Sequence, residues 1–112
     1  MHTVVETVPY LADAKRLFSA EEQATIVDTI STNPRCGDVM PGTGGVRKLR
    51  VAASGRGKRG GARVIYLFGG DNVPVFLLAC FAKNDKSDLS QAERNNLARM
   101  TVELIRSYRS GR

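Results

Sequence analysis

The amino-acid sequence predicts a single α+β domain over residues 1–112. Helical patterns occur near the start and at the end of the chain, whereas the strand patterns in the middle follow one another without a helix between them. Consecutive strands joined by short reversals pair antiparallel, and helices then gather beside the sheet. A chain of 112 residues can bury one core but not a second.

The first third of the sequence predicts one short strand and two helices. Residues 4–8 are mostly β-branched, which favours a strand. Pro9 stops the pairing and opens a helix with apolar residues at positions 10, 11, 14, 17 and 18. A second helix begins at Ser19, whose spacing to Glu22 is that of a capping box, and ends at Asn33-Pro34.

The remainder predicts a three-stranded antiparallel meander and a closing helix. Residues 35–45 are rich in glycine and are expected to form a loop, and strands are expected over 46–51, 62–68 and 73–83. The last of these runs is apolar enough to be covered on both faces. A second capping box, Ser90 with Glu93, starts the final helix. Its expected buried stripe comprises Leu97, Met100, Thr101, Leu104, Ile105 and Tyr108.

Positive charge is concentrated in the middle third of the chain. The formal net charge is +6, and residues 39–70 carry seven cations and no acid. Such a segment suits a phosphate backbone, an acidic protein or an anionic lipid. Lipid is disfavoured because the longest apolar run, residues 75–82, has only the length of a strand. Glu6 and Asp13 lie where a signal peptide would be basic and then apolar, so a cytoplasmic protein with no membrane contact is expected.

Few residues are available for acid–base or metal chemistry. His2 is the only histidine and is expected at a frayed, solvated terminus, and Cys36 with Cys80 are expected to be unpaired thiols. Asp85 and Asp88 lie beside a helix start, where acidic residues complement the helix dipole. No metal and no cofactor are therefore expected, and any catalysis would rest on cations, hydroxyls or water.

Lysine and arginine suit one reaction in particular, the cleavage of RNA by its own 2′-hydroxyl. The reaction requires a base, stabilisation of a pentavalent phosphate and protonation of the leaving oxygen. A lysine among other cations is biased toward its neutral form, so Lys48 or Lys58 could act as the base while Arg50 and Arg63 grip the phosphate. A basic face without chemistry explains the same pattern, and charge alone favours binding over catalysis. Tyr66 could stack on bases, although its alternation with Val64 favours a place in the core.

Four stretches resemble one family, the RelE/HigB superfamily of type II toxins, and in particular its HigB-like branch. They comprise Asn33-Pro34 with Gly37-Asp38, residues 41–50 (PGTGGVRKLR), residues 57–66 (GKRGGARVIY), and residues 81–84 (FAKN) with Asp88-Leu89. The resemblance covers nearly the whole chain in order. It implies a microbial-RNase-like fold, cleavage of messenger RNA on the ribosome, and a cognate antitoxin. In this branch the antitoxin is usually a helix-turn-helix protein that represses the shared operon, which would place operator DNA in indirect contact with the toxin.

The resemblance also implies roles for individual residues. The basic pair of the family falls on Lys48 and Arg50, and its phosphate-gripping arginine falls on Arg63. Expected contacts to RNA or the ribosome are Arg47, Arg56, Lys58, Arg59 and Lys83. The sequence departs from the best-known RelE pattern at two sites: a further arginine is replaced by Asn84, and the C-terminal tyrosine falls on Ser90. Tyr66 and Asn84 are accordingly expected only as accessory residues. The alternatives to an RNA-cleaving toxin are a silent basic module that binds RNA or DNA and a degenerate toxin that acts only in a repressor complex.

Overall fold

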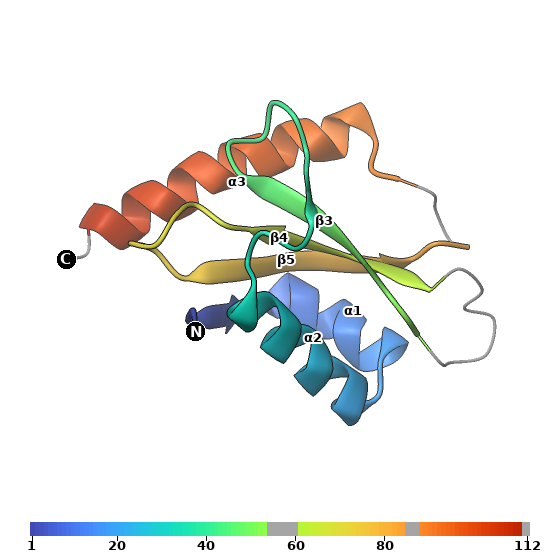
Figure 1. Ribbon diagram of the computed structural model, residues 1–112. Coiled ribbons are helices and arrows are strands. Elements are labelled where there is room, and N and C mark those ends of the chain that lie inside the picture. Colours follow the sequence, from blue (N-terminus) through green and yellow to red (C-terminus); the bar gives the residue numbers. More distant parts are fainter. Residues whose placement is uncertain (54–60, 85–87, 111–112) are drawn as a thin grey trace.

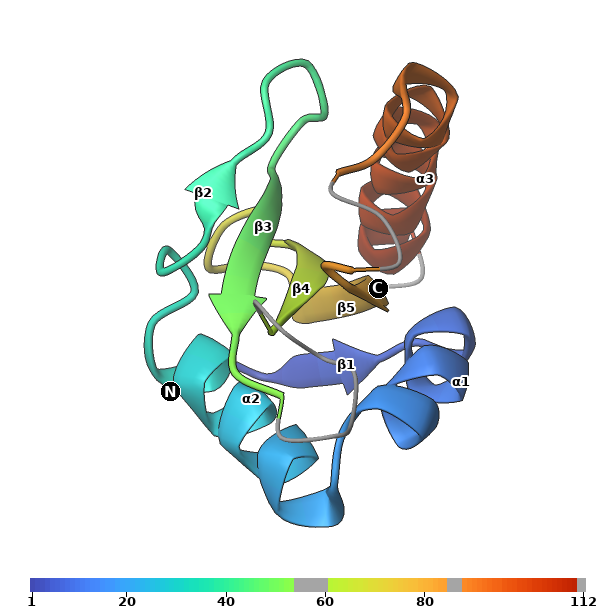
Figure 2. The same cartoon turned by 90° about the vertical axis from the view of Figure 1, so that its right-hand side faces the viewer.

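The computed structural model describes residues 1–53, 61–84 and 88–110, which form a mixed sheet with helices on both faces (Figures 1 and 2). The strands are β1 (Val4–Glu6), β2 (Asp38–Val39), β3 (Val46–Val51), β4 (Ala62–Leu67) and β5 (Val75–Ala82). The helices are α1 (Val8–Leu17), α2 (Ala20–Thr32) and α3 (Gln91–Ser110). The α+β class predicted from the sequence is confirmed. No helix among the described residues is long and apolar enough to span a membrane.

The order of the strands in the sheet is β1-β5-β4-β3-β2. The expected meander of β3, β4 and β5 is present and antiparallel. Two pairings go beyond it: β1 lies parallel to β5, and β2 pairs with β3 through Asp38 opposite Lys48 and Val39 opposite Arg47. The expectation of a loop throughout residues 35–45 is wrong at β2. Its two residues are exposed and carry no alternating pattern, so their pairing depends on β3 beside them.

Each face of the sheet has its own apolar core. Side chains of α1 and α2 pack against Val64, Tyr66 and Leu77 on one face. The other core joins Leu97 of α3 to Val46, Ile65, Leu67, Phe76, Leu78 and Phe81. Figure 2 shows α3 on one side of the sheet and the first two helices on the other. The two-residue alternation along β3 and β4 therefore assigns every side chain to one of these two layers.

Both predicted capping boxes are present and fix where helices begin. Ser19 Oγ accepts from the Glu22 amide at 3.1 Å, and Glu22 Oε1 accepts from the Ser19 amide at 2.9 Å. Ser90 and Glu93 make the same reciprocal pair at 3.1 and 2.8 Å. Each box satisfies two amide groups that a helix start would otherwise leave without partners.

The expected buried stripe of α3 is only partly correct. Leu97 and Thr101 are buried, whereas Met100 is 41% and Tyr108 is 38% exposed. Met100 neighbours Thr101 in sequence and therefore points about 100° away from it around the helix. Tyr108 lies in the last turn, beside the β4–β5 connection at Asp71 and Asn72.

The N-terminus is held in place, so the prediction that His2 is frayed and solvated is wrong. The His2 amide donates to the Ser31 carbonyl at 2.9 Å, and Ser31 Oγ donates to the His2 carbonyl at 2.7 Å. The imidazole lies edge-on to Phe68 and within 3.1 Å of the Asp71 carboxylate. Parallel pairing of β1 with β5 brings His2 to these partners, and sequence distance alone does not indicate that pairing.

Candidate nucleic-acid interface

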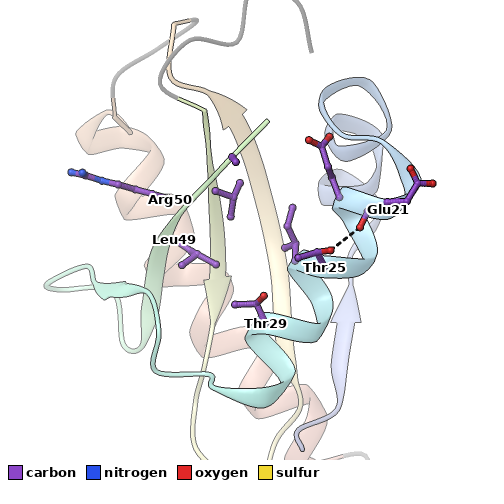
Figure 3. Close-up of a pocket in the computed structure, with 9 residues that line it drawn as sticks. Glu21, Thr25, Thr29, Leu49 and Arg50 are labelled. Atoms are coloured by element: carbon purple, nitrogen blue, oxygen red, sulfur yellow. Dashed lines mark hydrogen bonds between the residues drawn. The ribbon is translucent and has the colours of Figure 1, made fainter. Parts of the chain in front are cut away.

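Three of the predicted site residues, Lys48, Arg50 and Arg63, lie on one face of the sheet. Val46 of β3 and Ile65 of β4 belong to the α3-side core, and positions two residues away share their face. Figure 3 shows the intervening Leu49 turned toward α2 and Arg50 turned away from it. The expectation that Lys48 and Arg50 project together is therefore confirmed.

Arg50 and Arg63 lie directly opposite each other in the β3–β4 ladder. Arg50 is exposed, whereas Arg63 is only 6% exposed, and its Nη1 donates to the Ala62 carbonyl at 3.2 Å. Like charges directly opposite on an antiparallel pair destabilise a sheet. An anion placed between the two guanidinium groups would relieve that repulsion, and the planar fork of arginine suits a phosphate.

Lys48 takes part in an ion-pair network that the sequence analysis did not identify. Its Nζ donates to Asp88 Oδ1 at 3.2 Å, and Arg94 Nη2 donates to Asp88 Oδ2 at 3.0 Å. The Leu89 amide also donates to Asp88 Oδ1, at 2.8 Å. This backbone hydrogen bond, followed by the contact with Lys48, lowers the pKa of Asp88 and keeps it a carboxylate. Asp88 and Arg94 are six positions apart, on either side of a helix start. Nothing in their spacing indicates a contact with Lys48, which lies forty residues before Asp88.

Arg47 and Tyr66 lie on the other face and hold the turn before β2. Arg47 Nη1 donates to the carbonyls of Gly37 at 2.8 Å and Arg35 at 3.2 Å. The Tyr66 hydroxyl donates to the Pro34 carbonyl at 2.7 Å and accepts from the Gly37 amide at 2.8 Å. Tyr66 is fully buried, and this burial raises its pKa. The structure thus does not bring these two residues to the face of Lys48.

Two of the remaining predicted contacts lie directly after β5. Lys83 and Asn84 are exposed and come directly after β5, where the Lys83 amide donates to the Gly61 carbonyl at 3.1 Å. The register pairs Ala82 with Ala62, so Lys83 and Asn84 adjoin the end of the sheet that carries Arg63. Arg56, Lys58 and Arg59 lie outside the described residues.

A groove of about 370 Å³ lies between α2 and β3. Arg50 belongs to its lining, although the Arg50 side chain points away from α2 (Figure 3). Its walls include Thr25 and Thr29 of α2 and Leu49 of β3. Thr25 Oγ1 donates to the Glu21 carbonyl within its own helix at 3.0 Å. Within the described ranges, no three His, Cys, Asp or Glu side chains come close enough together to hold a metal ion.

Comparison with known proteins points to one family. The model of a family described as the RelE toxin of the RelE/RelB toxin–antitoxin system matches residues 18–110. Among solved structures, a mutant of the E. coli toxin RelE in the free state superposes with a TM-score of 0.57 and 17% sequence identity. The match covers 77% of this chain and 87% of the E. coli chain. At that identity the superposition supports a shared fold, and it agrees with the layers described above.

Proposed function

The chain belongs to the RelE toxin family of toxin–antitoxin systems, and we propose that it is a ribosome-dependent endoribonuclease that cuts messenger RNA. The observation that carries the proposal is the convergence of Lys48, Arg50 and Arg63 on one sheet face, with two arginines in direct register. This is an arrangement for holding a phosphate in place. The HigB-like branch remains a prediction from the sequence motifs.

The proposed reaction is a transesterification within the RNA. The 2′-oxygen attacks the adjacent phosphorus, the bond from phosphorus to the 5′-oxygen breaks, and the products are a 2′,3′-cyclic phosphate and a 5′-hydroxyl. The proton lost by the 2′-hydroxyl is balanced by the proton gained by the leaving 5′-oxygen. Charge on the pentavalent phosphate rises during this step, so fixed cations lower its barrier. The proposed reaction uses no metal.

Arg50 and Arg63 are proposed to grip the non-bridging oxygens of the reacting phosphate. Arg63 is held by burial and by its bond to the Ala62 carbonyl, which limits the reorganisation needed when charge develops. Lys48, which lies two residues before Arg50 on β3, is proposed to stabilise the same charge. Lys48 is surrounded by cations in the sequence, whereas in the structure Asp88 also contacts it. We therefore propose an ammonium role for Lys48 in place of a general base.

Dependence on the ribosome follows from the small number of catalytic groups. The site supplies fixed positive charge but few groups that can act as general acid or base. The cleavage rate of such a site increases most when the substrate is already held close to the geometry of attack. Arg56, Lys58, Arg59 and Lys83 are proposed to contact ribosomal RNA or the message. Arg47 and Tyr66 are proposed to stabilise the fold, because their polar groups bind the turn before β2. Asn84 is proposed as an accessory residue beside the site.

Family membership also implies a protein partner, the antitoxin. We propose that it is a helix-turn-helix protein and that this chain reaches operator DNA only through it. We further propose a cytoplasmic location, as required of a protein that acts on translating ribosomes. A silent basic module and a degenerate toxin remain as alternatives, because both use the same charged face without cleavage.

Primer extension on a defined message in a purified translation system tests the proposal. We expect cuts at codon positions that require ribosomes and disappear in the Arg63→Ala protein, which should still bind ribosomes. Arg16→Ala is the matched control, since Arg16 is an exposed arginine of α1 paired with Asp13. Intact message together with salt-sensitive binding would favour the silent module. Equal cutting of naked RNA would contradict the dependence on ribosomes.

A further inference from the structure

Asp88 joins two cations from distant parts of the chain, Lys48 of β3 and Arg94 of α3. Each carboxylate oxygen accepts from one of them, and the Leu89 amide fixes the carboxylate to the backbone. The Lys48 and Arg94 side chains are 24% and 31% exposed, so their charged ends are held and yet reach solvent. We propose that Arg94 is a further RNA-backbone contact and that Asp88 is a positioning residue for Lys48, an inference that rests on the proposed function.

The position of Arg94 relative to the reacting phosphate follows from the spacing along β3. Lys48 and Arg50 are two residues apart on one face, which separates their backbones by about 7 Å. Arg50 and Arg63 face each other at one step, Lys48 lies one step further along, and Asp88 bonds both Lys48 and Arg94. Arg94 therefore contacts the phosphate next to the reacting one, while Lys48 lies between the two.

The Asp88 carboxylate does not repel the RNA backbone, because the positive charges of Lys48 and Arg94 exceed its single negative charge. What Asp88 contributes is geometry. A lysine side chain has four rotatable bonds and stays mobile unless another group holds it. A fixed acceptor is therefore needed to hold its ammonium group in one place. Removing the acceptor leaves the local charge more positive and the ammonium less ordered. Binding and catalysis should then change in opposite directions, which no general loss of folding produces.

Two measurements on the protein separate these effects. The first is the salt dependence of binding to a short RNA with 2′-deoxyribose at the cleavage site, which cannot be cut. For Arg94→Ala we expect roughly tenfold weaker binding at low salt and a log–log slope smaller by about one, as expected when one phosphate contact is lost. Arg94→Lys should keep the slope. Arg99→Ala is the matched control on the same helix and should also keep it, and an unchanged slope in Arg94→Ala would overturn the contact.

The second measurement is the single-turnover cleavage rate at saturating ribosomes. Asp88→Ala, which removes the acceptor, should bind the uncleavable RNA as tightly as the wild type or more tightly, and yet cleave at least tenfold more slowly. Parallel loss of binding, cleavage and thermal stability would mean that Asp88 is only structural and would overturn its positioning role. If the wild-type protein cuts nothing, the proposed function fails and the role of Asp88 with it. The salt slope of Arg94→Ala still decides the Arg94 contact in that case.

Discussion

Arg50 and Arg63 face each other directly across the β3–β4 ladder, on the side of the sheet that carries α3. Two cations in this register repel each other, and such pairs reduce stability by up to about 1 kcal/mol. Two arginines side by side on one sheet face are typical of a site that binds a ligand of opposite charge. Four variants test this and other contacts of the fold. Arg50→Ala and Arg47→Ala separate stability from activity, whereas Tyr66→Phe and Gly61→Ala test stability alone.

Arg50→Ala should leave the free energy of unfolding unchanged or raise it by up to about 1 kcal/mol, because it removes the cross-strand repulsion. Cleavage should fall at least 100-fold, since a fixed charge on the phosphate is lost. Urea denaturation and the translation assay measure the two effects. A clear loss of stability would show that Arg50 makes stabilising contacts of its own.

Arg47→Ala should behave in the opposite way. Its guanidinium group bonds two carbonyls of the turn before β2, and loss of such charge-assisted bonds costs about 2 kcal/mol. Cleavage per folded molecule should stay within about threefold of wild type, if Arg47 has only this structural role. Comparison of activity with the folded fraction from circular dichroism tests this. Lost cleavage at full stability would instead support the sequence-based prediction of an RNA contact.

Tyr66→Phe should lower stability by about 1–3 kcal/mol at neutral pH, because the Gly37 amide and the Pro34 carbonyl lose a buried partner. The pKa of Tyr66 is raised above its usual 10.0 by burial. The hydroxyl therefore ionises in the unfolded chain first, and wild-type stability falls as pH rises above about 10. Burial also raises the pKa of Tyr10, which adds to that fall. Urea midpoints between pH 7 and 11 should decline less steeply in the Tyr66→Phe protein.

Gly61→Ala should destabilise the protein by more than about 2 kcal/mol. Gly61 has a φ of +72°, a conformation that side chains disfavour, and an added Cβ would collide with the Val51 carbonyl. Gly42→Ala is the matched control, because its φ of +76° is similar and nothing lies within 4 Å of an added Cβ. Thermal unfolding of both variants separates the cost of the steric clash at Gly61 from the cost of a positive φ, which both positions share. Equal losses would mean that the collision is relieved by small shifts.

Much of the fold could be predicted because local chemistry specifies it. Capping boxes at Ser19 and Ser90 fixed helix starts, and the two-residue alternation on β3 and β4 placed Lys48, Arg50 and Arg63 on one face. Such features need only residues near one another in sequence. The basic face itself was therefore evident from the order of residues.

The features that the sequence did not indicate depend on long-range pairing. Contacts of Asp88 with Lys48, and of His2 with Asp71, span 40 and 69 residues. Nothing in the spacing of these residues specifies which partner each one meets. The hydrogen bonds of the Tyr66 hydroxyl and of Arg47 likewise follow from a turn whose path is set by the whole sheet. Position on a face is thus predictable from pattern, whereas the partner across the sheet is not.

The parallel pairing of β1 with β5 has a consequence for synthesis of the protein. Val4 pairs with Val75, so β1 gains a neighbouring strand only after β5 has been synthesised. β5 also lies between β1 and β4, so the sheet cannot be completed until residue 82 has emerged from the ribosome. Contacts so distant in sequence make folding slow. The β3–β4 hairpin that carries Arg50 and Arg63 can pair before β5 has been made, whereas β1 cannot join the sheet until β5 is in place.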